Sequence, residues 1–176
     1  ALKLMLLTLS RTTEIVGARW EEFDLDKALW VIPAARMKMR EDHLIPLPNQ
    51  AVSLIRSLST ITGGRAHLFP NRNHPSKPAS KGVLWKAVQH MGFDERFSPH
   101  GVRATGSTLL NGMGFRADLI EKQLAHEERN KSRASYNRAT YIEERRTMMQ
   151  HWADYLDGLA KGKVVAGKFS QINEAA

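Results

Sequence analysis

The chain has 176 residues and carries 26 Lys and Arg residues against 18 Asp and Glu residues, a net charge of +8 that favours a polyanionic partner such as DNA, RNA or an acidic membrane. Hydrophobic residues make up 42% of the chain, which suits one globular domain, and no apolar run reaches the roughly 18 residues that a membrane span needs. The chain contains no cysteine, which excludes disulfides and thiolate metal sites and is consistent with a reducing cytoplasm.

The hydrophobic pattern predicts helices around a small antiparallel sheet. The first helix is apolar and starts at once, without an initiator Met, so we expect the chain to be a fragment whose N-terminal part is missing. A polar, basic hairpin at 36–42 separates the last two strands. The expected elements are helices at 2–9 and 12–20, strands at 23–26, 29–33 and 43–47, helices at 49–59, 80–91, 99–111 and 116–125, and a helical stretch from 132 that ends in a long helix at 139–160.

The start of the 99–111 helix combines a histidine with an arginine. His100 and Arg103 are three residues apart, so they share one helical face near the N-terminus. That end of a helix has unpaired N–H groups and a positive dipole, both of which favour an anion. One interpretation is a phosphate site, and the other is a capped helix with an arginine on its surface.

Other polar residues also have two interpretations, functional or structural. Arg11 lies between two apolar helices, where it either binds an anion or simply pairs with Glu14. The structural interpretation of Lys38, at the tip of the hairpin, is a solvated turn residue. That of His126 is a C-capping histidine, and that of Tyr136 is a half-buried packing residue.

These residues occur in an order that identifies a family. From Ala1 to about Ala160 the chain resembles the catalytic domain of the tyrosine recombinases, in particular the integrases of temperate phages and prophage islands. The stretches that carry the resemblance are Arg-Thr-Thr-Glu at 11–14, Arg-Met-Lys-Met at 36–39, His-Leu-Ile-Pro-Leu at 43–47, His-Gly-Val-Arg at 100–103, Leu-Ala-His at 124–126 and Ala-Ser-Tyr-Asn-Arg-Ala at 134–139. Leu-Gly-His is commoner in the family at the fifth of these, where this chain has Ala125.

The resemblance implies an α+β fold, mainly helical, with a small three-stranded antiparallel sheet. It implies a catalytic domain at 1–161, a C-terminal tail at 162–176, and N-terminal DNA-binding domains that lie outside this chain. The activity implied is site-specific DNA recombination for prophage integration and excision. It proceeds by transesterification through a 3′-phosphotyrosyl intermediate.

The resemblance also assigns residues to the scissile phosphate. Arg11 and Arg103 resemble the two arginines that clamp it, and Glu14 resembles the acidic residue that supports the first of them. His100 resembles the histidine that binds the phosphate or accepts the proton of the tyrosine. His126 resembles the histidine that donates to a non-bridging oxygen.

Two further roles concern bond making and breaking. Lys38 resembles the hairpin lysine that protonates the leaving 5′ oxygen, and Tyr136 resembles the nucleophile. Tyr141 is the second candidate nucleophile, although its place at the start of the long helix favours packing. Tyr155 falls on the apolar stripe of that helix, which we expect to pack in the core.

The partners implied are double-stranded DNA carrying attachment sites, further copies of the chain in a tetramer, and an accessory directionality factor, all in the cytoplasm of a bacterial host. No metal or other cofactor is expected. The alternatives are a type IB topoisomerase-like relaxase, a DNA-binding prophage remnant without catalysis, and a metal-dependent nuclease built on some of the seven histidines.

Overall fold

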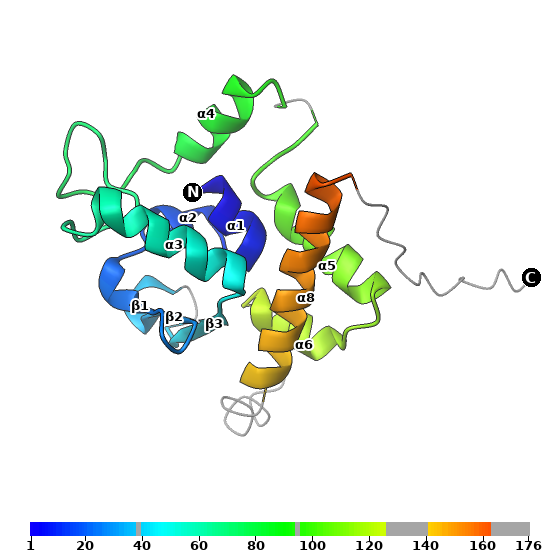
Figure 1. The fold of residues 1–176 in the computed structure, drawn as a ribbon. Helices are drawn as coiled ribbons and strands as arrows, with labels where there is room; N and C mark the ends of the chain where they lie inside the picture. Colours follow the sequence, from blue (N-terminus) through cyan, green and yellow to red (C-terminus); the bar gives the residue numbers. More distant parts are fainter. Residues whose placement is uncertain (38–39, 94–95, 126–140, 163–176) are drawn as a thin grey trace, which may run out of the picture.

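The computed structural model of the chain describes residues 1–37, 40–93, 96–125 and 141–162. Its elements, labelled as in Figure 1, are α1 (Leu2–Thr8), α2 (Thr12–Val16), the 3-10 turn η1 (Trp20–Glu22), β1 (Phe23–Asp24), β2 (Leu29–Ile32), the 3-10 turn η2 (Ala34–Arg36), β3 (His43–Pro46), α3 (Asn49–Thr62), α4 (Val83–His90), α5 (Gly101–Gly112), α6 (Ala117–Gln123) and α8 (Ile142–Ala160).

The three strands form an antiparallel sheet in the order β1-β2-β3. Side chains alternate along β2, so that Trp30 and Ile32 face inward and are fully buried. Ile45 of β3 lies opposite Trp30 in the register and His43 lies opposite Ile32, which places a histidine at an inward-facing position. Phe23 stacks on Trp30 with ring centroids 5.1 Å apart. The predicted mainly helical fold with a small antiparallel sheet is therefore confirmed.

Helix α1 lies at the centre of the core. Its Leu4 and Met5 are fully inaccessible to solvent, and the helix packs against α3 on one side and α8 on the other (Figure 1). Helix α8 also packs against β3 and α6, and α6 packs against α5. These contacts bring the C-terminal end of α6 beside the junction between α1 and α2.

The second helix is shorter than the sequence predicts. It ends at Val16, where Trp20 was expected, because Gly17 closes the helix and the backbone that follows pairs with a distant segment. Arg19 forms an isolated bridge with His67, and Trp20 N donates to Ala66 O at 3.1 Å. A partner far along the chain therefore competes with the helical hydrogen bonds.

Other boundaries also differ, and β1 ends at Asp24 although the sequence predicts a strand to residue 26. The sequence suggests Asn49 as the N-cap of a helix to about 59, whereas Asn49 is the first residue of α3, Pro48 is the N-cap, and α3 continues to Thr62 before Gly63. Helix α4 begins at Val83, after a turn, and not at Ser80. The predicted helical stretch from 132 and the tail after 162 lie outside the described residues.

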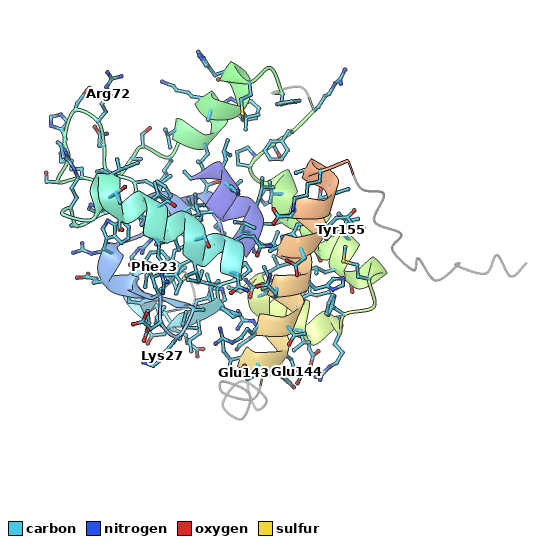
Figure 2. All side chains as sticks on the ribbon, viewed as in Figure 1. Phe23, Lys27, Arg72, Glu143, Glu144 and Tyr155 are labelled. Atoms are coloured by element: carbon cyan, nitrogen blue, oxygen red, sulfur yellow. The ribbon has the colours of Figure 1, made fainter. Side chains whose placement is uncertain are left out.

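The long helix α8 packs largely as predicted. Met148, Met149 and Trp152 are buried, and Tyr155 stacks on Trp152. Leu159, which the sequence also places on the apolar stripe, lies near the C-terminal end of α8 and is exposed. Figure 2 shows Glu143 and Glu144 at the N-terminal end of α8 and Tyr155 towards the other end. Within the described ranges, no helix is long and apolar enough to cross a membrane.

Candidate functional site

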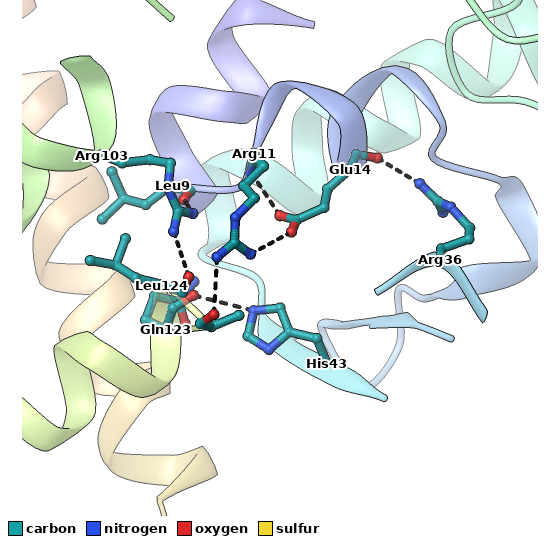
Figure 3. A network of polar contacts seen from close by, with 9 residues as sticks. Leu9, Arg11, Glu14, Arg36, His43, Arg103, Gln123 and Leu124 are labelled. Carbon is teal, nitrogen blue, oxygen red and sulfur yellow. Dashed lines mark hydrogen bonds and ion pairs between the residues drawn. The ribbon is translucent and has the colours of Figure 1, made fainter. Parts of the chain in front are cut away.

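The candidate site surrounds the C-terminal end of α6. The last carbonyl groups of a helix have no partner inside the helix and carry partial negative charge, so they attract cationic donors. At this end three successive carbonyls each accept a hydrogen bond from a different basic side chain (Figure 3). The pairs are His43 Nε2 with Gln123 O at 3.2 Å, Arg103 Nη2 with Leu124 O, and Arg11 Nη2 with Ala125 O at 3.0 Å.

Arg11 is held from two directions. It is the N-cap residue of α2, and its Nη1 donates to Glu14 Oε1 at 2.9 Å. The other carboxylate oxygen of Glu14 accepts from the backbone N of Arg11 at 2.7 Å. The Glu14 side chain is 6% exposed whereas that of Arg11 is 38% exposed. The predicted pairing with Glu14 is therefore present, and the guanidinium keeps a solvent-accessible face.

Arg103 projects from the first turns of α5 into the interior. The residue is 7% exposed, and its two terminal nitrogens donate to Leu9 O and Leu124 O. Burial is the main cause that lowers the pKa of Arg103 to about 10, and the positive charge of Arg11 contributes in the same direction. The side chain still carries its charge at neutral pH. Two guanidinium groups therefore lie close enough to repel each other.

Backbone strain coincides with the carbonyls that anchor both arginines. Leu9, with φ 54°, and Ala125, with φ 48°, both adopt the left-handed conformation that side chains disfavour. Leu9 O accepts from Arg103 and Ala125 O accepts from Arg11. Close packing supports the first of these, since a Cβ added to Gly106 of α5 would lie 2.5 Å from the Leu9 side chain. The surrounding fold holds the two strained residues in place.

Arg36 connects this site to the base of the hairpin. Its Nη2 donates to Glu14 O at 2.9 Å, and its Nη1 pairs with the buried carboxylate of Glu22. Gly17 leaves the space for this approach, because a Cβ there would lie 2.8 Å from Arg36 Nη2. Arg36, two residues before Lys38, thus contacts the backbone of Glu14, whose carboxylate pairs with Arg11.

His43 contacts the end of α6, although the sequence assigns it only to a strand and to a stretch that carries the resemblance, without a role in the site. Burial lowers its pKa to about 3, and the neighbouring positive charge of Arg145 acts in the same direction. The ring is therefore neutral at physiological pH and donates one N–H to Gln123 O. The available signal was a polar residue two positions before Ile45, on the inward-facing side of β3.

Arg145 was also missed. It lies on α8, is 3% exposed, and donates to the Gln123 side chain and to Leu44 O. The signal was its spacing, because Arg145 falls three residues after Ile142 and four before Met149, on the apolar stripe of the helix. A charged residue on such a stripe requires polar partners inside the core.

His100 and Arg103 differ in their surroundings. Helix α5 begins at Gly101, so His100 is its N-cap residue and is exposed, whereas Arg103 is buried. Ser98 Oγ accepts from Gly101 N at 2.9 Å and so caps the helix. The guanidinium of Arg103 contacts the end of α6 and not the first amides of its own helix.

The remaining predicted residues, Lys38, His126 and Tyr136, lie outside the described residues. Two of them directly follow described positions, since Lys38 follows Met37 and His126 follows the Ala125 that binds Arg11. The second candidate nucleophile has a packing role: Tyr141 is the N-cap residue of α8, and the guanidinium of Arg116 lies 5.2 Å from the centre of its ring. In the described part of the chain, no three His, Asp or Glu side chains are grouped to hold a metal ion.

Comparison with known proteins identifies relatives. A family model described as the phage integrase family matches residues 1–143. The prophage integrase IntA of Escherichia coli K12 is 41% identical over 167 residues, covering 95% of this chain and 40% of that protein. The integrase of Enterobacteria phage P4 is 42% identical over 173 residues, covering 89% of this chain and 39% of that protein. The chain thus spans about two fifths of the length of these relatives.

The fold also matches a solved structure. The integrase from mycobacterium phage Brujita superposes with a TM-score of 0.63 at 18% identity, over 86% of this chain and 51% of that one. At this level of identity the likeness concerns the fold, and it agrees with the arrangement of helices around the small sheet.

Proposed function

Because the chain belongs to the phage integrase family, we propose that it cleaves and rejoins DNA strands in site-specific recombination, through a 3′-phosphotyrosyl intermediate. The observation that carries the proposal is the pair of guanidinium groups of Arg11 and Arg103, both fixed on backbone carbonyls at the end of α6. Fixed cations of this kind suit a phosphodiester, whose negative charge grows in the transition state.

Arginine is the appropriate residue for this phosphate site. Its guanidinium offers paired donors that match phosphate oxygens, and it keeps its charge at any physiological pH. Glu14 and the helix-end carbonyls fix the groups in advance, so little reorganisation is needed when the phosphate arrives. We expect His126 to donate to a non-bridging oxygen of the same phosphate.

Tyr136 is proposed as the nucleophile. A tyrosine with an ordinary pKa near 10 is a poor nucleophile at neutral pH, so it needs a base or a strongly positive site. The phenol oxygen attacks phosphorus while His100 accepts its proton, and the bond to the 5′ oxygen breaks as Lys38 donates a proton to it. The products are a 3′-phosphotyrosine and a 5′-hydroxyl, and attack by a second 5′-hydroxyl reverses the reaction on another strand.

The proposal extends to partners and to the longer protein. The net charge of +8 supports binding to double-stranded DNA, through phosphate contacts that weaken with salt. We assign residues 1–161 to the catalytic domain and 162–176 to a tail, with DNA-binding domains N-terminal to this chain. Assembly as a tetramer on attachment sites, control by a directionality factor and action in the bacterial cytoplasm complete the proposal.

The experiment that tests this uses a pool of nicked duplexes of randomised sequence, which trap a cleaved strand on the protein. The purified protein is incubated with the pool in EDTA, and denaturing gels reveal covalent protein–DNA bands. We expect a band that Tyr136→Phe abolishes and Tyr141→Phe retains. Absence of any band from the parent protein refutes cleavage and favours a DNA-binding protein without catalysis.

The sequences recovered from the trapped DNA then separate two enzyme classes. Two duplexes that carry the selected sequence are mixed, and products that join strands of different duplexes are counted. A recombinase joins them. A type IB topoisomerase-like enzyme relaxes a supercoiled plasmid without exchanging strands between duplexes, and this result would overturn the recombinase assignment.

A further inference from the structure

A buried arginine connects α8 to the end of α6. Arg145 Nη2 donates to Gln123 Oε1 at 2.7 Å, and its Nε donates to the same oxygen at 3.2 Å. Nη2 also donates to Leu44 O of β3 at 2.7 Å. One side chain therefore bridges a helix, a strand and the helix end on which the arginine pair rests.

Gln123 continues this connection to α1. Its Nε2 donates to Thr8 O at 2.8 Å, so its amide group is bonded at both ends in the protein interior. Thr8 is the last residue of α1, immediately before the Leu9 whose carbonyl accepts from Arg103. The side chain of Gln123 thus fixes α6 relative to the end of α1, where Leu9 O accepts from Arg103.

Among the residues that the structure describes, the hydrogen-bond partners of Arg145 are an amide and a backbone carbonyl, both uncharged. Burial lowers the pKa of Arg145 to about 10, which leaves it protonated at neutral pH. A buried cation that donates to neutral groups is expensive to maintain when packing alone is required, since an apolar side chain of similar volume would fill the same space. The presence of an arginine here therefore favours a role in which the rigid fork of the guanidinium matters.

We propose that Arg145 is a positioning residue for the arginine pair. It locks Gln123, and through Gln123 it fixes the carbonyls of residues 123–125 on which Arg11 and Arg103 are oriented. This inference rests on the proposed function, because the arginine pair is the proposed phosphate clamp. The proposal also connects the arginine pair to α8, the helix that follows Tyr136 along the chain.

Arg145→Lys tests the proposal. Lysine keeps the charge and most of the length but lacks the planar fork that reaches Gln123 and Leu44 together. The matched control is Arg146→Lys on the same helix, because the hydrogen bonds of Arg146 to described residues go to Glu143 and Ala28 O, away from the carbonyls at the end of α6. Both variants are compared with the parent in single-turnover formation of the covalent complex on the DNA sequence selected above.

A second substrate identifies how Arg145 acts. In a methylphosphonate duplex, an uncharged methyl group replaces one non-bridging oxygen at the scissile position, which weakens the demand for cationic clamping. We expect R145K to slow cleavage of the phosphodiester by about 10- to 100-fold, the scale of a small misplacement of catalytic groups. DNA affinity should stay within about twofold, since most affinity comes from contacts to the other phosphates. On the methylphosphonate the penalty should be several-fold smaller.

The outcomes are distinct. R145K that cleaves the phosphodiester as fast as R146K overturns the inference, and so does equal slowing on both substrates, which indicates general structural damage. Circular dichroism checks folding at the assay temperature. Gln123→Asn, which keeps the amide but shortens its reach, replaces R145K with the same expectations if R145K is unfolded. A parent protein that forms no covalent complex counts against the proposed function instead.

Discussion

Glu14→Gln removes the negative charge of the side chain that anchors Arg11 and leaves the shape of that side chain almost unchanged. In the structure this carboxylate accepts two hydrogen bonds from Arg11, at 2.9 Å from the guanidinium and 2.7 Å from the backbone. Its charge also raises the pKa of Arg103, opposing the effect of Arg11. The substitution therefore leaves two neighbouring cations without their shared counter-ion.

The magnitude follows from burial. A hydrogen bond to a charged group contributes about 1.5–3 kcal/mol, and the glutamine oxygen can keep one of the two. Removing one partner of a fully buried pair costs about 3–5 kcal/mol. The 38% exposure of Arg11 allows water to screen part of this loss. We therefore expect the free energy of unfolding to fall by about 2 kcal/mol.

Urea unfolding followed by circular dichroism measures this change. With an m-value of about 2 kcal/mol/M, the midpoint should fall by about 1 M. Glu21→Gln is the matched control, since Glu21 accepts from Arg19 at 2.6 Å in an exposed ion pair. It should change the free energy by less than about 0.5 kcal/mol. An E14Q midpoint equal to that of E21Q would refute the reasoning and show that Ala125 O alone sets the position of Arg11.

Three further predictions concern pH, packing and backbone strain. Burial lowers the pKa of His43 to about 3, so below pH 6.5 the unfolded chain binds a proton that the folded chain does not. The free energy of unfolding should thus fall by about 2 kcal/mol more between pH 7 and pH 5 in the parent than in His43→Gln, and parallel pH profiles in urea unfolding would contradict this. Gly106→Ala should destabilise the protein by about 1 kcal/mol, because overpacking against Leu9 outweighs the helix propensity that alanine adds, and a higher melting temperature would disprove the close approach. Ala125→Gly should raise stability by about 0.5–1 kcal/mol, as should the control Ala28→Gly at φ 49°, and a gain only in the control would contradict backbone strain at Ala125.

Local patterns in the sequence predict much of the fold. The period of hydrophobic residues gives the types of the helices and strands, and the spacing of Arg11 and Glu14 gives their pairing, because contacts three residues apart are local. The end of the second helix is wrong by four residues, since the backbone N–H of Trp20 donates to the carbonyl of Ala66, 46 positions away. Local propensity contains no information on such a partner.

The same distinction applies to the site. The resemblance names Arg103, but no periodicity reveals that its guanidinium rests on Leu9 O and Leu124 O, because these carbonyls come from separate helices. His43 and Arg145 carry signals that are visible in the sequence, as polar residues on apolar faces. Those signals say that a partner exists inside the core, and only the packing of α6 against α8 and β3 identifies Gln123 as that partner.

The central claim is that the arginine pair presents a DNA phosphate to Tyr136. Peptide mapping of the trapped covalent complex tests it most directly. The complex is digested with nuclease and trypsin, and mass spectrometry locates the peptide that retains a nucleotide. Trypsin separates the candidates, because Tyr136 lies in the peptide 134–138 and Tyr141 in the peptide 139–145. A nucleotide adduct on 134–138 is the predicted result, and an adduct on 139–145 would contradict the assignment of the nucleophile.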